Sequence, residues 1–165
     1  MTPLLVALYV ILLDQASKEW VRGAFSLHES VELIPGFFSL TYIRNTGAAW
    51  GMFSGQNLTL ALLAFVMLVA LVMFRRRILP PGPLHRVALG LLCGGIAGNL
   101  FDRLRLDYVT DYLDFYIQTW HWPAFNIADA AICIGVGIYL LGTVMMPAPT
   151  PAGETPAAET PASEP

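Results

Sequence analysis

Residues 58–74, L-T-L-A-L-L-A-F-V-M-L-V-A-L-V-M-F, decide the fold class of this chain, because Thr59 is the only polar side chain among the seventeen. An α-helix rises about 1.5 Å per residue, so a helix of this length approaches the thickness of the hydrocarbon core of a bilayer. The stretch therefore predicts a membrane-spanning helix.

Three further apolar blocks surround this helix, at residues 4–13, 87–101 and 127–146. The first lacks the basic residues and the small-residue cleavage site of a secretory signal peptide, so it predicts a retained helix. The second has Gly90, Gly94 and Gly98 at four-residue spacing, which favours close contact between helices in a membrane. We predict an all-α integral membrane domain over residues 1–146, with four transmembrane helices at about 4–22, 57–74, 84–101 and 126–146.

The composition agrees with this prediction, since 56% of the residues are hydrophobic and only 13% are charged. Soluble domains have roughly 45–50% and 25%. The net charge of −3 also argues against a nucleic-acid-binding protein. Cys93 and Cys133 lie in apolar runs away from other metal ligands, so we interpret both as core thiols and expect no metal site.

Basic residues predict the orientation of the four helices. The short connection between the apolar blocks at 58–74 and 87–101 carries Arg75, Arg76, Arg77, His85 and Arg86 and no acid. The positive-inside rule places this connection in the cytoplasm. Both termini are then cytoplasmic, and the two longer connections lie on the outer face.

The first outer connection contains strand-forming residues on both sides of Pro35-Gly36, so we expect a small β-hairpin or sheet at about 29–54. The second outer connection is rich in aspartate yet too apolar for a free loop. Residues 147–165 consist mainly of Pro, Ala, Thr and Glu, which predicts a disordered tail.

Ionisable and amide side chains gather at the outer ends of the predicted helices. Intramembrane carboxylates are costly and indicate a functional site. Simpler explanations remain open for single members. Asp14 and Lys18 fit a helical i, i+4 ion pair, and Asn126 with Asp129 fits a helix capping box. We interpret Asp102 and Asp107 as ordinary interfacial charges, and Asp114 as a solvated loop carboxylate.

Five blocks of sequence occur in a recognisable order: D-Q-A-S-K at 14–18, N-T-G-A-A-W-G at 45–51, G-G-I-A-G-N-L-F-D-R at 94–103, V-T-D-Y-L-D-F at 109–115, and F-N-I-A-D at 125–129. Together they resemble the signature blocks of the bacterial lipoprotein signal peptidases, the type II signal peptidases. The resemblance covers about residues 4–146 and leaves out the tail.

The resemblance implies an intramembrane aspartic endopeptidase of the bacterial inner membrane, with its active site near the periplasmic face. Its substrates would be prolipoproteins, cut just before a cysteine that carries a diacylglyceryl group. It implies Asp111 and Asp129 as the catalytic pair and no cofactor. Membrane lipids and globomycin-type cyclic peptide inhibitors would be further ligands, and we expect a monomer. Residues that would line or brace the site are Asp14, Lys18, Asn45, Gly47, Ala49, Gly95, Asn99, Arg103, Asn126 and Ala128.

Two nearby carboxylates cannot both ionise cheaply, so such a pair shares one proton. We take Asp129, at a helix N-terminus, as the ionised partner and Asp111 as the proton holder. A small proton-coupled transporter or channel is the alternative function, although transporters usually place such groups near the midplane of the membrane. A serine or metallo-protease is disfavoured because no serine has an evident histidine partner and no H-E-x-x-H motif is present.

Overall fold

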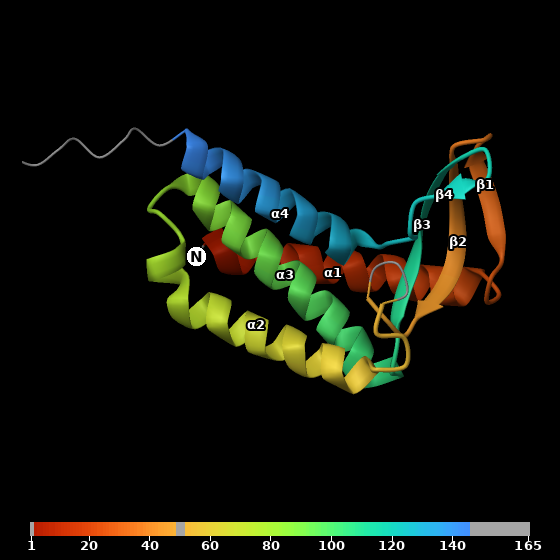
Figure 1. Cartoon of the computed structure of the whole chain (residues 1–165), viewed down its shortest axis with the longest axis horizontal. Helices are drawn as coiled ribbons and strands as arrows, with labels where there is room; N and C mark the ends of the chain where they lie inside the picture. The colour runs from red at the N-terminus through yellow and green to blue at the C-terminus, as the bar shows by residue number, and fades with distance from the viewer. Residues whose placement is uncertain (1, 49–51, 146–165) are drawn as a thin grey trace, which may run out of the picture.

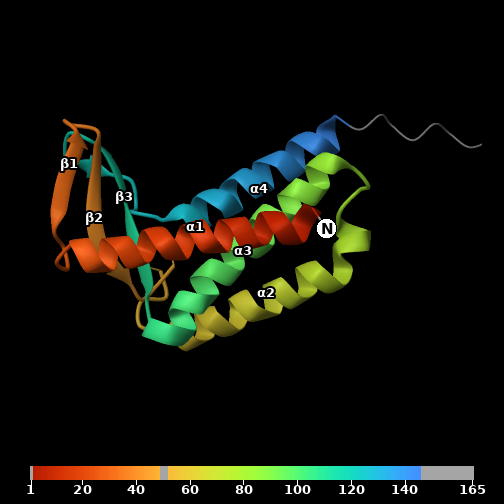
Figure 2. The same ribbon diagram turned by 180° about the vertical axis from the view of Figure 1, so that it is seen from behind.

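The computed structural model describes residues 2–48 and 52–145. Within them, helices α1 (Thr2–Ala24), α2 (Asn57–Ile78), α3 (Pro83–Leu106) and α4 (Ile127–Val144) form a bundle with a sheet at one end (Figure 1). α3 packs against the other three helices. Seen from behind, α1 runs from the far end of the bundle to the sheet (Figure 2).

The sheet is antiparallel, in the order β1-β2-β3-β4. The first outer connection supplies β1 (Ser30–Ile34) and β2 (Phe38–Asn45), and Gly36 takes a φ of 72° in the turn between them. The predicted hairpin is thus confirmed. β3 (Val109–Ile117) and β4 (Trp120–His121) come from the second outer connection, for which no strand was predicted.

Three helices in the described part of the chain, α2, α3 and α4, are long and apolar enough to cross a membrane. Most of α2 is exposed, as expected for a helix that faces lipid. The predicted helical fold is therefore confirmed, with a small antiparallel sheet at one end, and the three apolar helices support a multi-pass membrane protein.

The glycines of α3 bring helix backbones into close contact, as their spacing predicted. A Cβ atom built on Gly90 would lie 2.6 Å from the Cβ of Val6, and one on Gly94 would lie 2.8 Å from the Cβ of Val10. Both distances are shorter than van der Waals contact. Any side chain at these positions would push α1 away from α3.

Several local predictions need correction. α3 continues to Leu106, past the predicted end at residue 101, and stops where Asp107 takes a left-handed φ of 65°. His85, which we assigned to the connection between two apolar blocks, lies in the first turn of α3 and is buried. Cys133 is exposed on α4, so it is not a core thiol. Ala49, Trp50 and the predicted tail lie outside the described residues.

Candidate active site

Two predicted catalytic residues, Asp111 and Asp129, line one cavity of about 1040 Å³. Asp111 projects from β3, and its side chain is only 2% exposed. Asp129 lies in the first turn of α4 and is half-buried. The cavity lies at the sheet end of the bundle, and α3, α4 and the sheet contribute its walls.

Asn126, which is fully buried, links the two aspartates. Its Nδ2 donates to Oδ1 of Asp111 at 2.7 Å, and its Oδ1 accepts from the backbone N–H of Asp129 at 3.1 Å. The Asp129 Oδ2 accepts from the Asn126 backbone N–H at 3.2 Å, which completes a capping box. The capping box predicted from the sequence is thus present, and the same asparagine also holds Asp111.

Two further asparagines hold the outer sides of the pair. Asn45 on β2 donates through Nδ2 to Oδ2 of Asp111 at 2.8 Å. Asn99 on α3 donates through Nδ2 to Oδ1 of Asp129 at 2.7 Å. Each of the four carboxylate oxygens therefore accepts an amide hydrogen bond, three from asparagine side chains and one from the backbone N–H of Asn126.

A buried charge cluster lies behind the asparagines. Lys18 Nζ lies 2.8 Å from Asp14 Oδ2 and 3.3 Å from Asp102 Oδ2, and none of the three side chains is exposed. Lys18 also donates to Oδ1 of Asn99 at 2.9 Å, which turns the amide of Asn99 toward Asp129. The predicted i, i+4 ion pair exists, and it also orients a residue of the site.

The same cluster ties three elements together. Asp14 Oδ1 accepts from the backbone N–H of Ala128 at 2.9 Å, which fixes the start of α4 against α1. Asp102 Oδ2 accepts from the backbone N–H of Thr110 at 3.0 Å, which fixes β3 to α3 one residue before Asp111. Interpreting Asp102 as an ordinary interfacial charge was therefore wrong.

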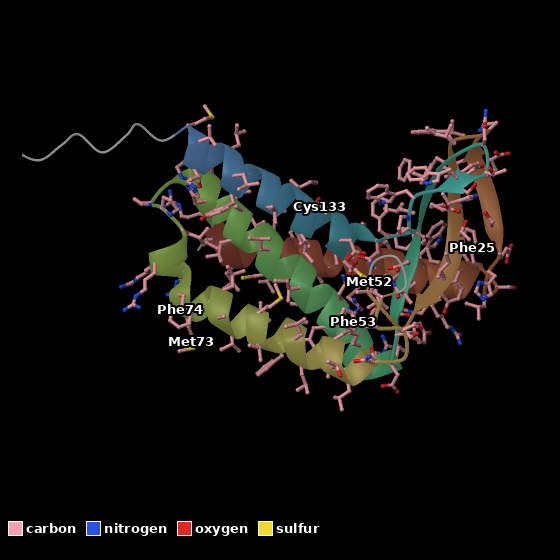
Figure 3. All side chains as sticks on the ribbon, viewed as in Figure 1. Phe25, Met52, Phe53, Met73, Phe74 and Cys133 are labelled. Atoms are coloured by element: carbon pink, nitrogen blue, oxygen red, sulfur yellow. The ribbon has the colours of Figure 1, made fainter. Side chains whose placement is uncertain are left out.

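Arg103 and the small residues shape the cavity. Arg103 donates to the carbonyl of Gly47 at 3.0 Å and so holds the loop after β2, in which Met52 and Phe53 are exposed (Figure 3). A Cβ on Gly47 would lie 2.7 Å from the carbonyl oxygen of Met52. Gly95 contacts the backbone of Ala128 and leaves no room for a side chain.

Asp114 is not the solvated carboxylate that we predicted. It is 8% exposed, on β3, and its two oxygens lie 2.9 Å from Nδ1 of His121 and 3.2 Å from Oγ1 of Thr41. These contacts join β2, β3 and β4. Asp107 is exposed at the end of α3, in agreement with its prediction.

The electrostatic environment of Asp111 favours its protonated form. Burial raises the pKa of Asp111 from 3.8 to about 7, and the nearby Asp129 carboxylate contributes in the same direction. Hydrogen bonds from Asn45 and Asn126 oppose part of this effect. A carboxylic acid that keeps its proton near neutral pH can act as a general acid.

The arrangement can support acid–base chemistry on a substrate in the cavity. No group of three His, Cys, Asp or Glu residues in the described ranges is placed to hold a metal ion. Paired carboxylates fixed by neutral amides are suited to activating a water molecule and polarising a carbonyl group.

Comparisons with known proteins identify the family. A family model described as signal peptidase (SPase) II matches residues 6–145. The lipoprotein signal peptidase of Syntrophotalea carbinolica is 42% identical over 141 residues, 84% of this chain and 88% of the relative. The lipoprotein signal peptidase of Yersinia pestis strain Pestoides F is 43% identical over 146 residues, 86% of each chain.

Two solved structures have a similar fold. Both are described as bacterial membrane enzyme structures obtained by the in meso method, and both are 34% identical to this chain. Their TM-scores are 0.79 and 0.77, with 87% of this chain covered in each case and 87% and 93% of theirs. This chain therefore belongs to the signal peptidase II family.

Proposed function

We propose that this protein is an intramembrane aspartic endopeptidase that removes the signal peptide from prolipoproteins, cutting just before the diacylglyceryl-modified cysteine. The observation that carries the proposal is the fully buried Asn126, which holds Asp111 and Asp129 on the wall of one cavity. Membership of the signal peptidase II family supports the substrate class.

In the proposed reaction, ionised Asp129 takes a proton from water, and the water oxygen attacks the carbonyl carbon of the scissile bond. Asp111 gives its proton to the carbonyl oxygen, which forms a tetrahedral diol. When the C–N bond breaks, Asp129 passes its proton to the leaving amine, and Asp111 recovers a proton from the diol hydroxyl. The raised pKa of Asp111 suits its role as the initial acid.

The supporting residues have positioning roles in this proposal. Asn45, Asn99 and Asn126 hold the carboxylates at fixed angles, and Lys18 holds Asn99. Fixed geometry contributes to rate because it removes the entropy cost of aligning the reacting groups. Globomycin-type cyclic peptides would be expected to bind in the same cavity, between the two aspartates.

We also propose four membrane spans, with α1 as the fourth, in the inner membrane. Arg75, Arg76, Arg77 and Arg86 lie at the end of the bundle opposite the sheet, which favours cytoplasmic termini and a periplasmic site (Figure 1). A cysteine placed at Gly82, in a variant without Cys93 and Cys133, should resist a membrane-impermeant maleimide in intact cells. Rapid labelling at this position would indicate the opposite orientation in the membrane.

The function is tested by incubating the purified protein with a diacylglyceryl-modified prolipoprotein and with the same precursor lacking the modification. We expect mass spectrometry to find cleavage before the cysteine of the modified precursor only. Cleavage elsewhere, or equal cleavage of both precursors, would contradict the proposed substrate. Proton flux into liposomes with no cleavage would favour the transporter.

A further inference from the structure

A second cavity lies between α1 and α4, on the other side of α4 from the catalytic cavity. Its volume is about 430 Å³, and its lining consists of apolar and aromatic side chains of α1, α3 and α4. Val10 and Ala131 on its floor are 5% exposed, whereas Tyr9 and Ile134 on its walls are 64% and 55% exposed. The cavity is therefore a groove that opens on the lipid-facing surface of the bundle. We name it the α1–α4 groove.

One end of the α1–α4 groove lies at the level of the catalytic site. Leu13 and Ile127 line this end, and each directly precedes a residue of the contact between Asp14 and the backbone N–H of Ala128. α1 runs toward the sheet and α4 runs away from it (Figures 1 and 2). The groove therefore runs away from the sheet, toward Leu5 and Ile134, for about 12 Å along α1.

The groove and the catalytic cavity meet at a small residue. Ala130 lines both cavities and follows Asp129 directly. Cys133, which also lines the catalytic cavity, is exposed one turn further along the same helix (Figure 3). Gly137, another turn along, has nothing within 4 Å of the place a Cβ would occupy. A flexible chain can therefore cross the outer face of α4 from the catalytic cavity into the groove.

We propose that the α1–α4 groove holds one acyl chain of the diacylglyceryl group on the substrate cysteine, an inference that rests on the proposed function. The acyl chains start at the residue next to the scissile bond and must remain in hydrocarbon. An apolar groove that begins beside Asp129 and descends into the membrane matches both conditions. A polar peptide would find no hydrogen-bond partners along most of this lining.

The groove binds the chain through its shape. The surrounding lipid tails are as apolar as the groove walls, so moving an acyl chain from lipid into the groove brings no hydrophobic gain. A chain seated in it makes close dispersion contacts on three sides. Seating one chain also limits the orientations of the modified cysteine, which places the preceding peptide bond against the two aspartates.

The test fills the groove with a large side chain and measures KM for two substrates with one peptide sequence. One substrate carries two hexadecanoyl chains and the other two butanoyl chains. Ile134→Trp should raise KM for the long-chain substrate by about tenfold, or about 1.4 kcal/mol, with little change for the short-chain substrate. Leu140→Trp is the matched control, because Leu140 is on the same helix, equally exposed at 55% and outside the groove.

Leu13→Trp with Leu12→Trp as its control repeats the comparison on α1, since Leu12 is exposed and lies outside the groove. Equal KM values for the groove variants and their controls would overturn the inference while the proposed function stands. Failure of the unchanged protein to cleave either substrate would instead overturn the proposed function.

A cross-linking experiment examines the groove without turnover. The Asp129→Asn variant is mixed with a substrate whose acyl chain ends in a diazirine, then irradiated and mapped by mass spectrometry. We expect adducts within residues 5–13 and 127–134. A phosphatidylglycerol carrying the same diazirine should label these segments less when unlabelled substrate is in excess. Undiminished labelling by the phospholipid would assign the groove to bulk lipid and overturn the proposal.

Discussion

Replacing Asp111 with asparagine should change how the stability of the protein depends on pH. The pKa of Asp111 rises from 3.8 to about 7 in the folded state because the side chain is buried and lies near Asp129. The folded state therefore holds this proton more tightly than the unfolded state. Its contribution to stability is complete below about pH 4 and is lost as the pH rises toward and through 7.

The size of the effect follows from the difference between the two pKa values. About three pH units correspond to about 4 kcal/mol, at about 1.4 kcal/mol per unit. Because Asp111 is only 2% exposed, solvent screening removes little of this value. Relative to Asp111→Asn, the unchanged protein should lose most of this contribution to its free energy of unfolding between pH 4 and 7. No further loss is expected above pH 8. For a domain of this size the relative shift in Tm is about 10 °C.

Apparent Tm values of both proteins, read by tryptophan fluorescence in detergent from pH 4 to 9, supply the test. Asp107→Asn serves as the control because it removes an exposed carboxylate and asparagine tolerates the left-handed backbone there. Its difference in Tm from the unchanged protein should not vary with pH. A difference in Tm for Asp111→Asn that stays constant from pH 4 to 9 would contradict the raised pKa of Asp111.

Other substitutions should have distinct effects. Lys18→Met removes the cation that Asp14 and Asp102 share and leaves Asp102 only the longer 3.8 Å contact with Arg22, so we expect a loss of about 3–5 kcal/mol in the free energy of unfolding; an unchanged Tm would contradict the buried cluster. Asn126→Ala should destabilise the protein by about 1 kcal/mol through loss of the cap, yet reduce kcat by about 100-fold because both aspartates lose a partner. An equal kcat for Asn126→Ala and the unchanged protein would exclude a positioning role for Asn126. Gly94→Val should cost at least about 1–3 kcal/mol by forcing α3 away from Val10, whereas Gly137→Val, at an open position, should be tolerated.

Features that depend on neighbouring residues could be predicted from the sequence. The capping box needs only Asn126 and Asp129, and the turn at Gly36 needs one residue with positive φ. The glycines of α3 indicated a close helix contact without indicating the partner. In each case the spacing along the chain determines which side chains can meet.

Features that depend on pairing between distant segments could not be predicted in the same way. Strand β3 is held by β2, by Thr110 against Asp102, and by a bridge at Leu113 to Phe125, all separated in sequence. Asp102 and Asp114 therefore looked like surface charges. Both are buried because partners from other elements, Lys18 and His121, reach them.

The catalytic roles of Asp111 and Asp129 are tested most directly by the single-turnover rate of cleavage of a diacylglyceryl-modified prolipoprotein by three variants, Asp111→Asn, Asp129→Asn and Asp114→Asn. We expect the first two to bind the precursor without cutting it, whereas Asp114→Asn, which lies on the cavity wall but bonds to His121 and Thr41 and not to the pair, should keep measurable activity. Cleavage at the normal rate by a folded Asp111→Asn or Asp129→Asn protein would contradict the aspartic pair.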